Sequence, residues 1–412
     1  MEGKNIIVGQ SGGPTAVINS SLAGIFARAR ELGASKIYGM LNGIQGFLEG
    51  RYVDIGRSIC SNRDVELLKN TPAAFLGSCR YKLPSAEDSI EIYNKIFSLL
   101  KELDIYAFFY IGGNDSMDTI NKLSNYARSI SCDIRFIGVP KTVDNDLVAT
   151  DHSPGFGSAA KYIATSMKEL IRDNKVNDQD VVTIVEIMGR DAGWLTGSSI
   201  LSKGVDCSGP DLIYLPEVVF DINRFIEDVK EVQKRNRTVI VAVSEGVKTE
   251  DGRYVCDFID SARSIDSFGH TQLTGTARVL ADLVAKRIGC KVRAVEFSSL
   301  QRCAAHIASL TDQSEAFMVG QKAVEAANEG HSGMFIQLNR IGDDPYMCET
   351  ALCDVGLVAN EKKDVPLSWM NEGNNYVSEE FINYVKPLIV GEVSIEYENG
   401  LPKHIPDVVN ER

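Results

Sequence analysis

The sequence has few of the features that mark secreted, zinc-binding or membrane-spanning proteins. Its nine cysteines are scattered without a CxxC pair, and its five histidines include no HExxH pair. We therefore expect reduced thiols, no zinc site, and structural roles for His152, His270 and His306. The N-terminal MEGK runs straight into NIIVG without the apolar region of a signal peptide, and no window approaches ~18 uncharged apolar residues. These absences predict a cytoplasmic protein that does not enter a membrane.

Positive charge is also in deficit. The chain has 43 Lys and Arg residues against 56 Asp and Glu residues, which gives a net charge of −13. General affinity for nucleic acid is therefore not expected, and an anionic small substrate would need a local cluster of cations. With 412 residues, 44% of them hydrophobic, the chain exceeds the size at which one core usually keeps growing. It predicts a globular protein of two domains.

Short apolar runs alternate with amphipathic stretches of helical length. This pattern predicts an α/β fold, in which parallel strands are joined by crossover helices. The expected strands are residues 5–9, 36–40, 106–113, 133–140, 181–189, 238–246 and 291–297. The expected helices are residues 15–33, 86–103, 116–130, 158–174 and 222–236. No low-complexity linker separates the two halves, so we expect closely packed domains that exchange segments, followed by a less regular tail.

Five polar or glycine-rich segments directly follow apolar strands. They are residues 9–15, 112–116, 140–146, 188–193 and 244–246. In open parallel sheets the ligand lies outside the carboxyl ends of the strands. The five segments together therefore predict one composite site.

The first segment, QSGGPT, joins a strand to a helix. Adjacent glycines let the backbone approach an anion while amide N–H groups face it. No GK[ST] follows, so this is not a Walker sequence, and a tight turn without a ligand explains the stretch equally well. A second glycine motif, GFGSAA at residues 155–160, has VATDHSP rather than a strand before it. We therefore discount a dinucleotide site there and expect glycines that serve helix entry.

The second segment, GGNDS, places Asn114, Asp115 and Ser116 at the mouth of the expected site. An aspartate beside a phosphate is unfavourable unless a cation intervenes, so the segment is consistent with a magnesium site. The alternative is an ordinary N-cap on a helix that begins at Met117.

The third segment, PKTVDND, sets Lys141 three residues before Asp144. Asp144 could take a proton from a hydroxyl group while Lys141 neutralises charge on a transferring phosphoryl group. In an extended segment Thr142 and Asp144 would face the same way. Taken alone, the stretch is more typical of a surface Asx-turn.

Four arginines near the ends of apolar strands are candidate phosphate clamps, because a guanidinium group presents a planar fork to phosphate oxygens. They are Arg80, Arg190, Arg293 and Arg302. Most arginines are merely solvated or salt-bridged, and composition does not select these four.

The ordered set SGGPTAVIN, LGSCR, GGNDS, PKTVDND, MGR, SEG and LQR resembles the phosphofructokinase family over roughly residues 5–340. The resemblance implies two Rossmann-like three-layer domains. Residues 1–155 with 301–351 would hold the phosphoryl donor, residues 156–300 would hold the sugar phosphate, and residues 352–412 would pack on the core. It also implies a homodimer or homotetramer with sites that span subunits.

Residue roles follow from the same resemblance. Asp144 would be the base on the 1-hydroxyl of fructose 6-phosphate, with Lys141 and Arg190 also catalytic. The implied sugar-phosphate residues are Thr142, Val143, Asp144, Met188, Gly189, Arg190, Glu245, Arg293, Ser299 and Arg302. The implied donor residues are Gly13, Arg80, Asp115 and Ser116, and the implied Mg²⁺ ligands are Asn114, Asp115 and Asp146.

Two residues bear on the donor. Members that use ATP typically show GGDGS and PGTxDND, with glycines where this chain has Asp115 and Lys141. Asp115 would intrude on the place of a nucleotide's α-phosphate, by bulk and by like charge. Lys141 would instead stabilise charge on pyrophosphate, as in the pyrophosphate-dependent branch that the chain resembles. An ATP-dependent enzyme and a non-catalytic sugar-phosphate-binding subunit are the alternatives.

The chain departs from the family pattern at several positions. Asn114 replaces the usual Asp, and Val181 replaces an arginine that often reaches a neighbouring subunit's sugar phosphate. Ser299 replaces the usual histidine or tyrosine before LQR. Ala23 and Ala27 stand where bacterial ATP-dependent relatives place effector-binding arginines, so we expect no allosteric control through that site.

Overall fold

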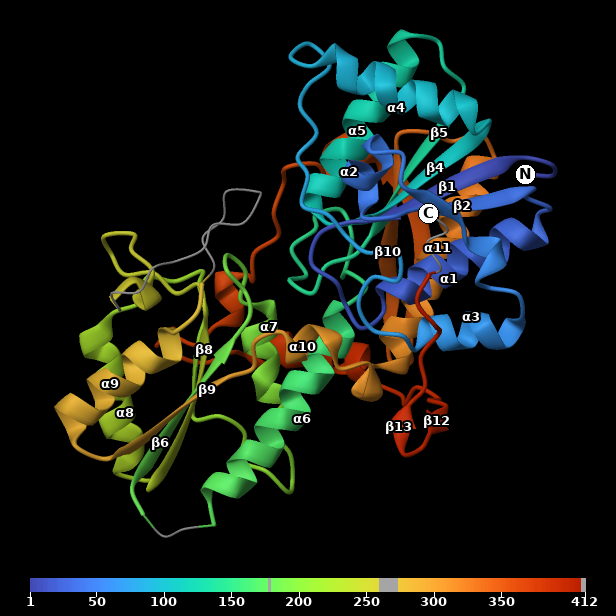
Figure 1. Ribbon diagram of the computed structural model, residues 1–412. Helices are drawn as coiled ribbons and strands as arrows, with labels where there is room; N and C mark the ends of the chain where they lie inside the picture. Colours follow the sequence, from blue (N-terminus) through green and yellow to red (C-terminus); the bar gives the residue numbers. More distant parts are fainter. Residues whose placement is uncertain (177–178, 259–272, 409–412) are drawn as a thin grey trace.

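The computed structural model describes residues 1–176, 179–258 and 273–408, and it divides into two α/β units (Figure 1). His270 lies outside the described residues. The larger unit is built on a seven-stranded sheet. Its strands, in spatial order, are β11 (Tyr346–Asp354), β10 (Met334–Asp343), β5 (Arg135–Pro140), β4 (Ile105–Gly112), β1 (Asn5–Gln10), β2 (Lys36–Met40) and β3 (Tyr52–Asp54). The inner strands run parallel, and β11 and β3 pair antiparallel at the two edges.

The smaller unit is built on a four-stranded parallel sheet. Its strands, in spatial order, are β7 (Leu212–Tyr214), β8 (Thr238–Ser244), β6 (Val181–Ile187) and β9 (Lys291–Glu296). The predicted fold class, two α/β units with mainly parallel sheets, is confirmed. The two central strands, β6 and β8, are nearly continuous runs of buried apolar residues, as expected when helices cover both faces of a parallel sheet.

Helices cover both faces of each sheet. They are α1 (Ile18–Glu31), α2 (Gly43–Leu48), α3 (Asn62–Lys69), α4 (Ile90–Glu102), α5 (Asn114–Ser129), α6 (Phe156–Asn174), α7 (Trp194–Gly197), α8 (Ile222–Gln233), α9 (Thr276–Ile288), α10 (Leu300–Cys303), α11 (Leu310–Asn328) and α12 (Glu379–Val385). In the larger unit α1 and α11 share one core with the sheet, and α4 and α5 share the other. In the smaller unit α8 and α9 cover one face and α6 covers the other. No described helix is both long enough and apolar enough to cross a membrane.

Helices α1 and α11 cross in close contact. A Cβ at Gly24 would lie 2.1 Å from the carbonyl oxygen of Phe317, and a Cβ at Gly320 would lie 2.2 Å from that of Ser21. Only glycine fits on both sides of such a crossing. The crossing fixes α1, whose N-terminus follows the glycine-rich turn after β1.

Most of the predicted elements are present, with shifted boundaries. Helix α1 begins at Ile18 and α4 at Ile90, later than the apolar pattern predicts, whereas α5 begins earlier, at Asn114. Asn114 and Asp115, which precede the predicted helix 116–130, are therefore in the first turn of α5, and the alternative of an N-cap on a helix that begins at Met117 is wrong. The predicted role of GFGSAA in helix entry is confirmed: Gly155 has a φ of 110°, and a Cβ at Gly157 would lie 2.5 Å from the carbonyl oxygen of Leu388.

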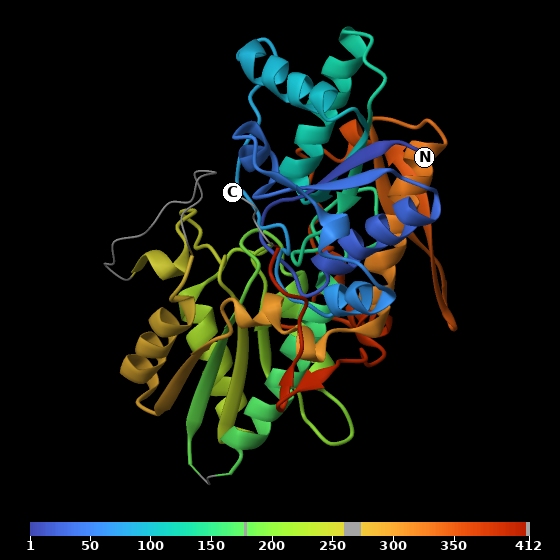
Figure 2. The same cartoon turned by 45° about the vertical axis from the view of Figure 1, so that its right-hand side comes forward.

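The tail after β11 contacts both units. Val365, Phe381 and Leu388 are buried in the core of the smaller unit, next to α6. Farther on, the short pair β12 (Tyr397–Glu398) and β13 (Leu401–Pro402) precedes Ile405, which is buried in the core of the larger unit. Figures 1 and 2 show this tail, in red, beside both units. The sequence predicts an irregular tail, but it does not predict this bridging course.

Candidate active site

A cavity of about 320 Å³ lies where the carboxyl ends of the two sheets face each other. All five predicted strand-end segments contribute to it. Its lining residues are Ser11, Gly12, Gly13, Pro14, Arg80, Gly113, Asn114, Asp115, Ser116, Lys141, Thr142, Val143, Asp144, Asp146, Met188, Arg190, Asp191, Ala192, Glu245, Arg302 and Lys362. This is the place where open α/β sheets bind ligands.

The turn after β1 supports two cations. Nζ of Lys141 donates a hydrogen bond to the carbonyl oxygen of Gly13 at 2.6 Å. A Cβ at Gly12 would lie 3.2 Å from this Nζ, and a Cβ at Gly13 would lie 2.9 Å from a guanidinium nitrogen of Arg302. Gly12 also has a φ of 77°, which favours glycine. The glycines thus leave room for Lys141 and Arg302 to pack on the turn, and together they form a wall suited to an anion.

The first turn of α5 carries an unsatisfied oxygen. Oδ1 of Asn114 is buried and has no hydrogen-bond partner among the described residues. Its amide nitrogen lies 3.5 Å from Oδ2 of Asp146. A buried polar atom without a partner is unusual, and an amide oxygen beside a carboxylate is a donor set that a hard divalent cation satisfies. The residues here fit Mg²⁺.

Asn145 holds the loop that carries the two aspartates. Its φ of 54° is left-handed, and its side chain points into the protein. Nδ2 donates to the hydroxyl of Tyr384 at 2.8 Å, and Oδ1 accepts from the backbone N–H of Ser153 at 3.0 Å. Asp144 and Asp146, on either side, both line the cleft. The surface Asx-turn considered for this stretch is therefore wrong, because the loop is anchored in the interior.

Three ionisable groups in the cleft have pKa values far from their ordinary ones. Burial, and then the neighbouring Asp146, raise the pKa of Asp144 to about 7. Burial lowers the pKa of Lys141 to about 8, against the attraction of Asp144. Burial, and then Asp144, raise the pKa of Glu245 to about 8. Such shifts cluster where proton transfer or ligand charge is handled, and Asp144 is thus suited to act as a base near neutral pH.

The wall of the cleft that contains Met188 and Arg190 depends on contacts that the sequence does not reveal. The backbone N–H of Met188 donates to Oε1 of the buried Gln301 at 3.2 Å. A Cβ at Gly246 would lie 1.7 Å from the carbonyl oxygen of Arg190, so only glycine allows the two segments to meet. Burial, and then nearby Arg80, lower the pKa of Arg302. Arg80 and Arg302 therefore repel each other at this wall of the cleft.

Three of the predicted sugar-phosphate residues do not line this cleft. Arg293 lies in register with Thr183, well before the carboxyl end of β9, and its NH1 pairs with Oδ2 of Asp173 at 3.0 Å. Ser299 is the exposed N-cap residue of α10. Gly189 does not line the cavity, and its carbonyl oxygen accepts a hydrogen bond from the hydroxyl of Ser244. These three are not among the residues that line the cavity of this chain, and their assignment to the sugar-phosphate site stays a prediction.

The cleft also contains residues that sequence reasoning missed. Asp191 and Ala192 directly follow the MGR motif, so their position in the chain was the available signal. Lys362 comes from the tail, within EKKD, where nothing in the sequence points to a site. A fifth cation thus reaches the cleft from the tail, in addition to Arg80, Lys141, Arg190 and Arg302.

The parallel sheets and the cation-lined cleft define a two-domain α/β protein with an anion-binding site. Residues 5–327 match the family described as Phosphofructokinase. The chain is 38% identical over 403 residues to the pyrophosphate--fructose 6-phosphate 1-phosphotransferase of Halomonas elongata, covering 97% of this chain and 95% of that protein. It is 31% identical over 373 residues to the sulfofructose kinase of Alkalicoccus urumqiensis, covering 90% and 93%.

A solved structure agrees with these relatives. The crystal structure of a pyrophosphate-dependent phosphofructokinase from Nitrosospira multiformis is similar with a TM-score of 0.88 and 37% identity, over 98% of this chain and 97% of that one. This chain belongs to the phosphofructokinase family.

Proposed function

We propose that this chain is a magnesium-dependent enzyme that reversibly transfers a phosphoryl group from pyrophosphate to the 1-hydroxyl of fructose 6-phosphate. The products are fructose 1,6-bisphosphate and phosphate. The observation that carries the proposal is the position of Lys141, which is buried, comes from the same loop as Asp144 and packs on the Gly12–Gly13 turn. The relatives named for this reaction support it, since they share the chain's full length.

Asp144 is the proposed base. Its pKa of about 7 leaves a large fraction ionised at neutral pH, and that fraction can accept the proton of the sugar's 1-hydroxyl as the new P–O bond forms. Lys141, Arg80 and Arg302 surround the donor side and would balance charge on the transferring group. Phosphate leaves as the P–O bond of pyrophosphate breaks, and the transfer proceeds in line without a covalent enzyme intermediate.

Asn114, Asp115 and Asp146 are the residues proposed to hold Mg²⁺. The unpartnered Oδ1 of Asn114, close to Asp146, supports this assignment. When bound, the ion would neutralise charge on the oxygens of the donor. Arg190, Met188 and Glu245 would hold the sugar phosphate on the opposite wall.

Asp115 is proposed to exclude ATP. It lies in the first turn of α5 and lines the cleft, where its carboxylate would meet the α-phosphate of a nucleotide. Pyrophosphate ends before that position. The ATP-dependent reaction remains the second candidate, because pyrophosphate and ATP present the same transferable group.

One assay separates the two donors. Fructose 1,6-bisphosphate formation is measured with Mg²⁺ and either pyrophosphate or ATP, and we expect turnover with pyrophosphate alone. Asp115→Gly should gain measurable ATP binding without full ATP turnover. Glu91→Gly is the matched control, because it removes an exposed acid from the first turn of another helix, α4. Turnover with ATP but not with pyrophosphate would refute the proposal.

We also propose a homodimer or homotetramer that works in the cytoplasm, without nucleic-acid or membrane partners. In this assignment residues 1–155 and 301–351 hold the donor, residues 156–300 hold the sugar phosphate, and residues 352–412 pack on both. The course of the tail, and Lys362 at the cleft, support that division. Sedimentation of the purified protein tests the oligomeric state.

A further inference from the structure

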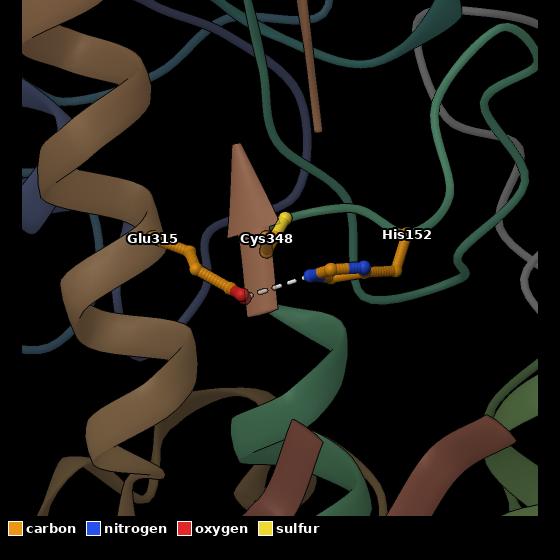
Figure 3. Close-up of side chains that lie close together, drawn as sticks. All are labelled: His152, Glu315 and Cys348. Carbon is orange, nitrogen blue, oxygen red and sulfur yellow. Dashed lines mark hydrogen bonds and ion pairs between the residues drawn. The ribbon is translucent and has the colours of Figure 1, made fainter. Parts of the chain in front are cut away.

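A second cluster of ligating side chains lies apart from the cleft, and three separate elements contribute to it. His152 comes from the loop before α6, Glu315 from α11 and Cys348 from β11 (Figure 3). One ligand atom from each lies within 4.8 Å of the other two. Nε2 of His152 is 2.7 Å from Oε2 of Glu315. None of the three lines the active-site cavity.

Neighbouring groups orient two of these side chains. Nδ1 of His152 lies 2.8 Å from Oδ1 of Asp151, and Arg340 donates to the same carboxylate oxygen at 2.9 Å. Oε1 of Glu315 accepts a hydrogen bond from the hydroxyl of Tyr346 at 2.6 Å. A histidine that binds a metal almost always has a carboxylate or carbonyl on its other nitrogen, and a ligating carboxylate is itself hydrogen-bonded. The cluster has both features.

The cluster is also accessible. His152 and Glu315 are buried, whereas Cys348 is partly exposed. Glu315, Tyr346 and Cys348 form part of the wall of an open surface groove of about 620 Å³. A metal ion could enter from this groove, and a water molecule from the groove could complete four-coordination.

We propose that His152, Glu315 and Cys348 form a binding site for a divalent transition metal, with Zn²⁺ as the expected ion. Imidazole and thiolate ligands suit Zn²⁺, and three protein ligands with one open position are a common zinc arrangement. Mg²⁺ prefers six oxygen ligands, so the two metals would occupy different sites. On binding, the metal would replace the proton held between Nε2 of His152 and Glu315, and that proton and the thiol proton of Cys348 would both pass to solvent.

The sequence gives no hint of this site, because its ligands lie far apart in the chain. A bound ion would link the end of the loop that follows the active-site aspartates to α11 and β11. We therefore expect it to stabilise the larger unit. In the metal-free protein His152 and Glu315 form a buried ion pair. The competing explanation of the cluster is that it serves only as this ion pair and binds no metal.

Cobalt provides the test, because a thiolate ligand gives Co²⁺ a charge-transfer absorption that oxygen ligands do not. The full-length protein is treated with a chelator, saturated with Mg²⁺ to occupy the cleft, and titrated with Co²⁺ and then Zn²⁺. We expect one thiolate-bound Co²⁺ per chain, displaced by Zn²⁺, and a higher melting temperature with either ion. Absence of the thiolate band in the wild-type protein would overturn the proposal.

Two serine variants locate the ion. Cys348→Ser should lose the thiolate band and bind Co²⁺ at least about tenfold more weakly. Cys353→Ser, on the same strand β11, is the matched control and should behave like the wild type. A thiolate band that persists in Cys348→Ser would place the metal elsewhere and refute this site. Circular dichroism of the metal-free variants confirms that both are folded before they are compared.

Discussion

The two sides of the cleft are built differently. On the donor side, Asn114, Lys141, Asp144 and Asp146 follow the neighbouring strands β4 and β5. On the proposed sugar side, Met188, Arg190 and Glu245 follow β6 and β8, while Lys362 comes from the tail. The donor side concentrates buried charge in one short stretch, and the sugar side gathers single contacts from several places. We therefore expect donor-side variants to change kcat and sugar-side variants to change KM for the sugar.

The largest expected effect is that of Asp144→Asn. The amide cannot accept the proton of the sugar hydroxyl, so kcat should fall by about 10³- to 10⁴-fold. KM for fructose 6-phosphate should change by no more than a few-fold, because the shape of the cleft is kept. Steady-state kinetics measure both quantities. A large loss of sugar affinity, seen by calorimetry, would show that Asp144 mainly binds the sugar.

The same variant should be more stable than the wild type. Burial raises the pKa of Asp144 to about 7, above the ordinary value that it regains on unfolding. The folded state therefore binds this proton more tightly, and the free energy of unfolding falls as pH rises through that interval. Asp144→Asn should raise the free energy of unfolding at pH 8 by about 4 kcal/mol, and by little at pH 4. Denaturant unfolding of the ligand-free protein at both pH values measures the difference. An equal rise in the free energy of unfolding at both pH values would show that it does not come from the raised pKa of Asp144.

Next in size is Lys141→Met, which removes the donor-side cation but keeps much of its volume. We expect kcat with pyrophosphate to fall by about 10²- to 10³-fold. Because the pKa of Lys141 is about 8, the wild-type rate should decline as the pH rises above that value, and the variant should lack this decline. The pH profile of kcat is the measurement. An alkaline decline that survives in the variant would assign it to another group.

On the sugar side, Glu245 offers a finer test. With a pKa of about 8, this carboxyl is mostly protonated at neutral pH, so Glu245→Gln should leave KM for fructose 6-phosphate within about threefold. Glu245→Ala removes the hydrogen-bonding group and should raise KM by about tenfold with a smaller change in kcat. Glu250→Ala, an exposed position nearby, is the control. If the Gln and Ala variants raise KM equally, Glu245 acts through its charge.

The smallest expected effect concerns the support beneath the loop. The hydroxyl of Tyr384 accepts from Asn145 and donates to the carbonyl oxygen of Asp151 at 2.6 Å. Tyr384→Phe leaves Nδ2 of Asn145 unpaired, whereas the carbonyl oxygen of Asp151 keeps its hydrogen bond from Nζ of Lys363. The variant should cost about 1 kcal/mol of stability, with a fall in kcat of less than about tenfold. Thermal unfolding and kinetics measure the two effects, and Tyr397→Phe at an exposed position is the control. An unchanged kcat would show that Asn145 holds the loop without this contact.

The sequence predicts the fold class and much of the donor side, because both depend on local pattern. Apolar runs of strand length are followed by polar residues, and the order of those runs places the polar residues at one edge of the sheet. It does not predict Lys362 as part of the site, nor the contacts by which Gln301 and Gly246 support the wall of the cleft, since these depend on distant segments of the chain. Arg293 illustrates a related point, because it lies within β9, in register with Thr183, and not at the carboxyl end of the strand. A strand-end motif indicates which strand a residue belongs to, but it does not show whether that residue reaches the end of the strand.

The position of β10 in the larger sheet determines the order in which the protein can fold. This strand pairs with β5, yet the whole smaller unit lies between them in the chain. During synthesis one edge of β5 stays uncovered while about 200 further residues are made, roughly 10 to 40 s at ordinary elongation rates. A nascent chain at that stage exposes apolar strand residues that the finished protein buries. Ribosome pausing within the smaller unit should therefore increase aggregation of this protein more than pausing after β11.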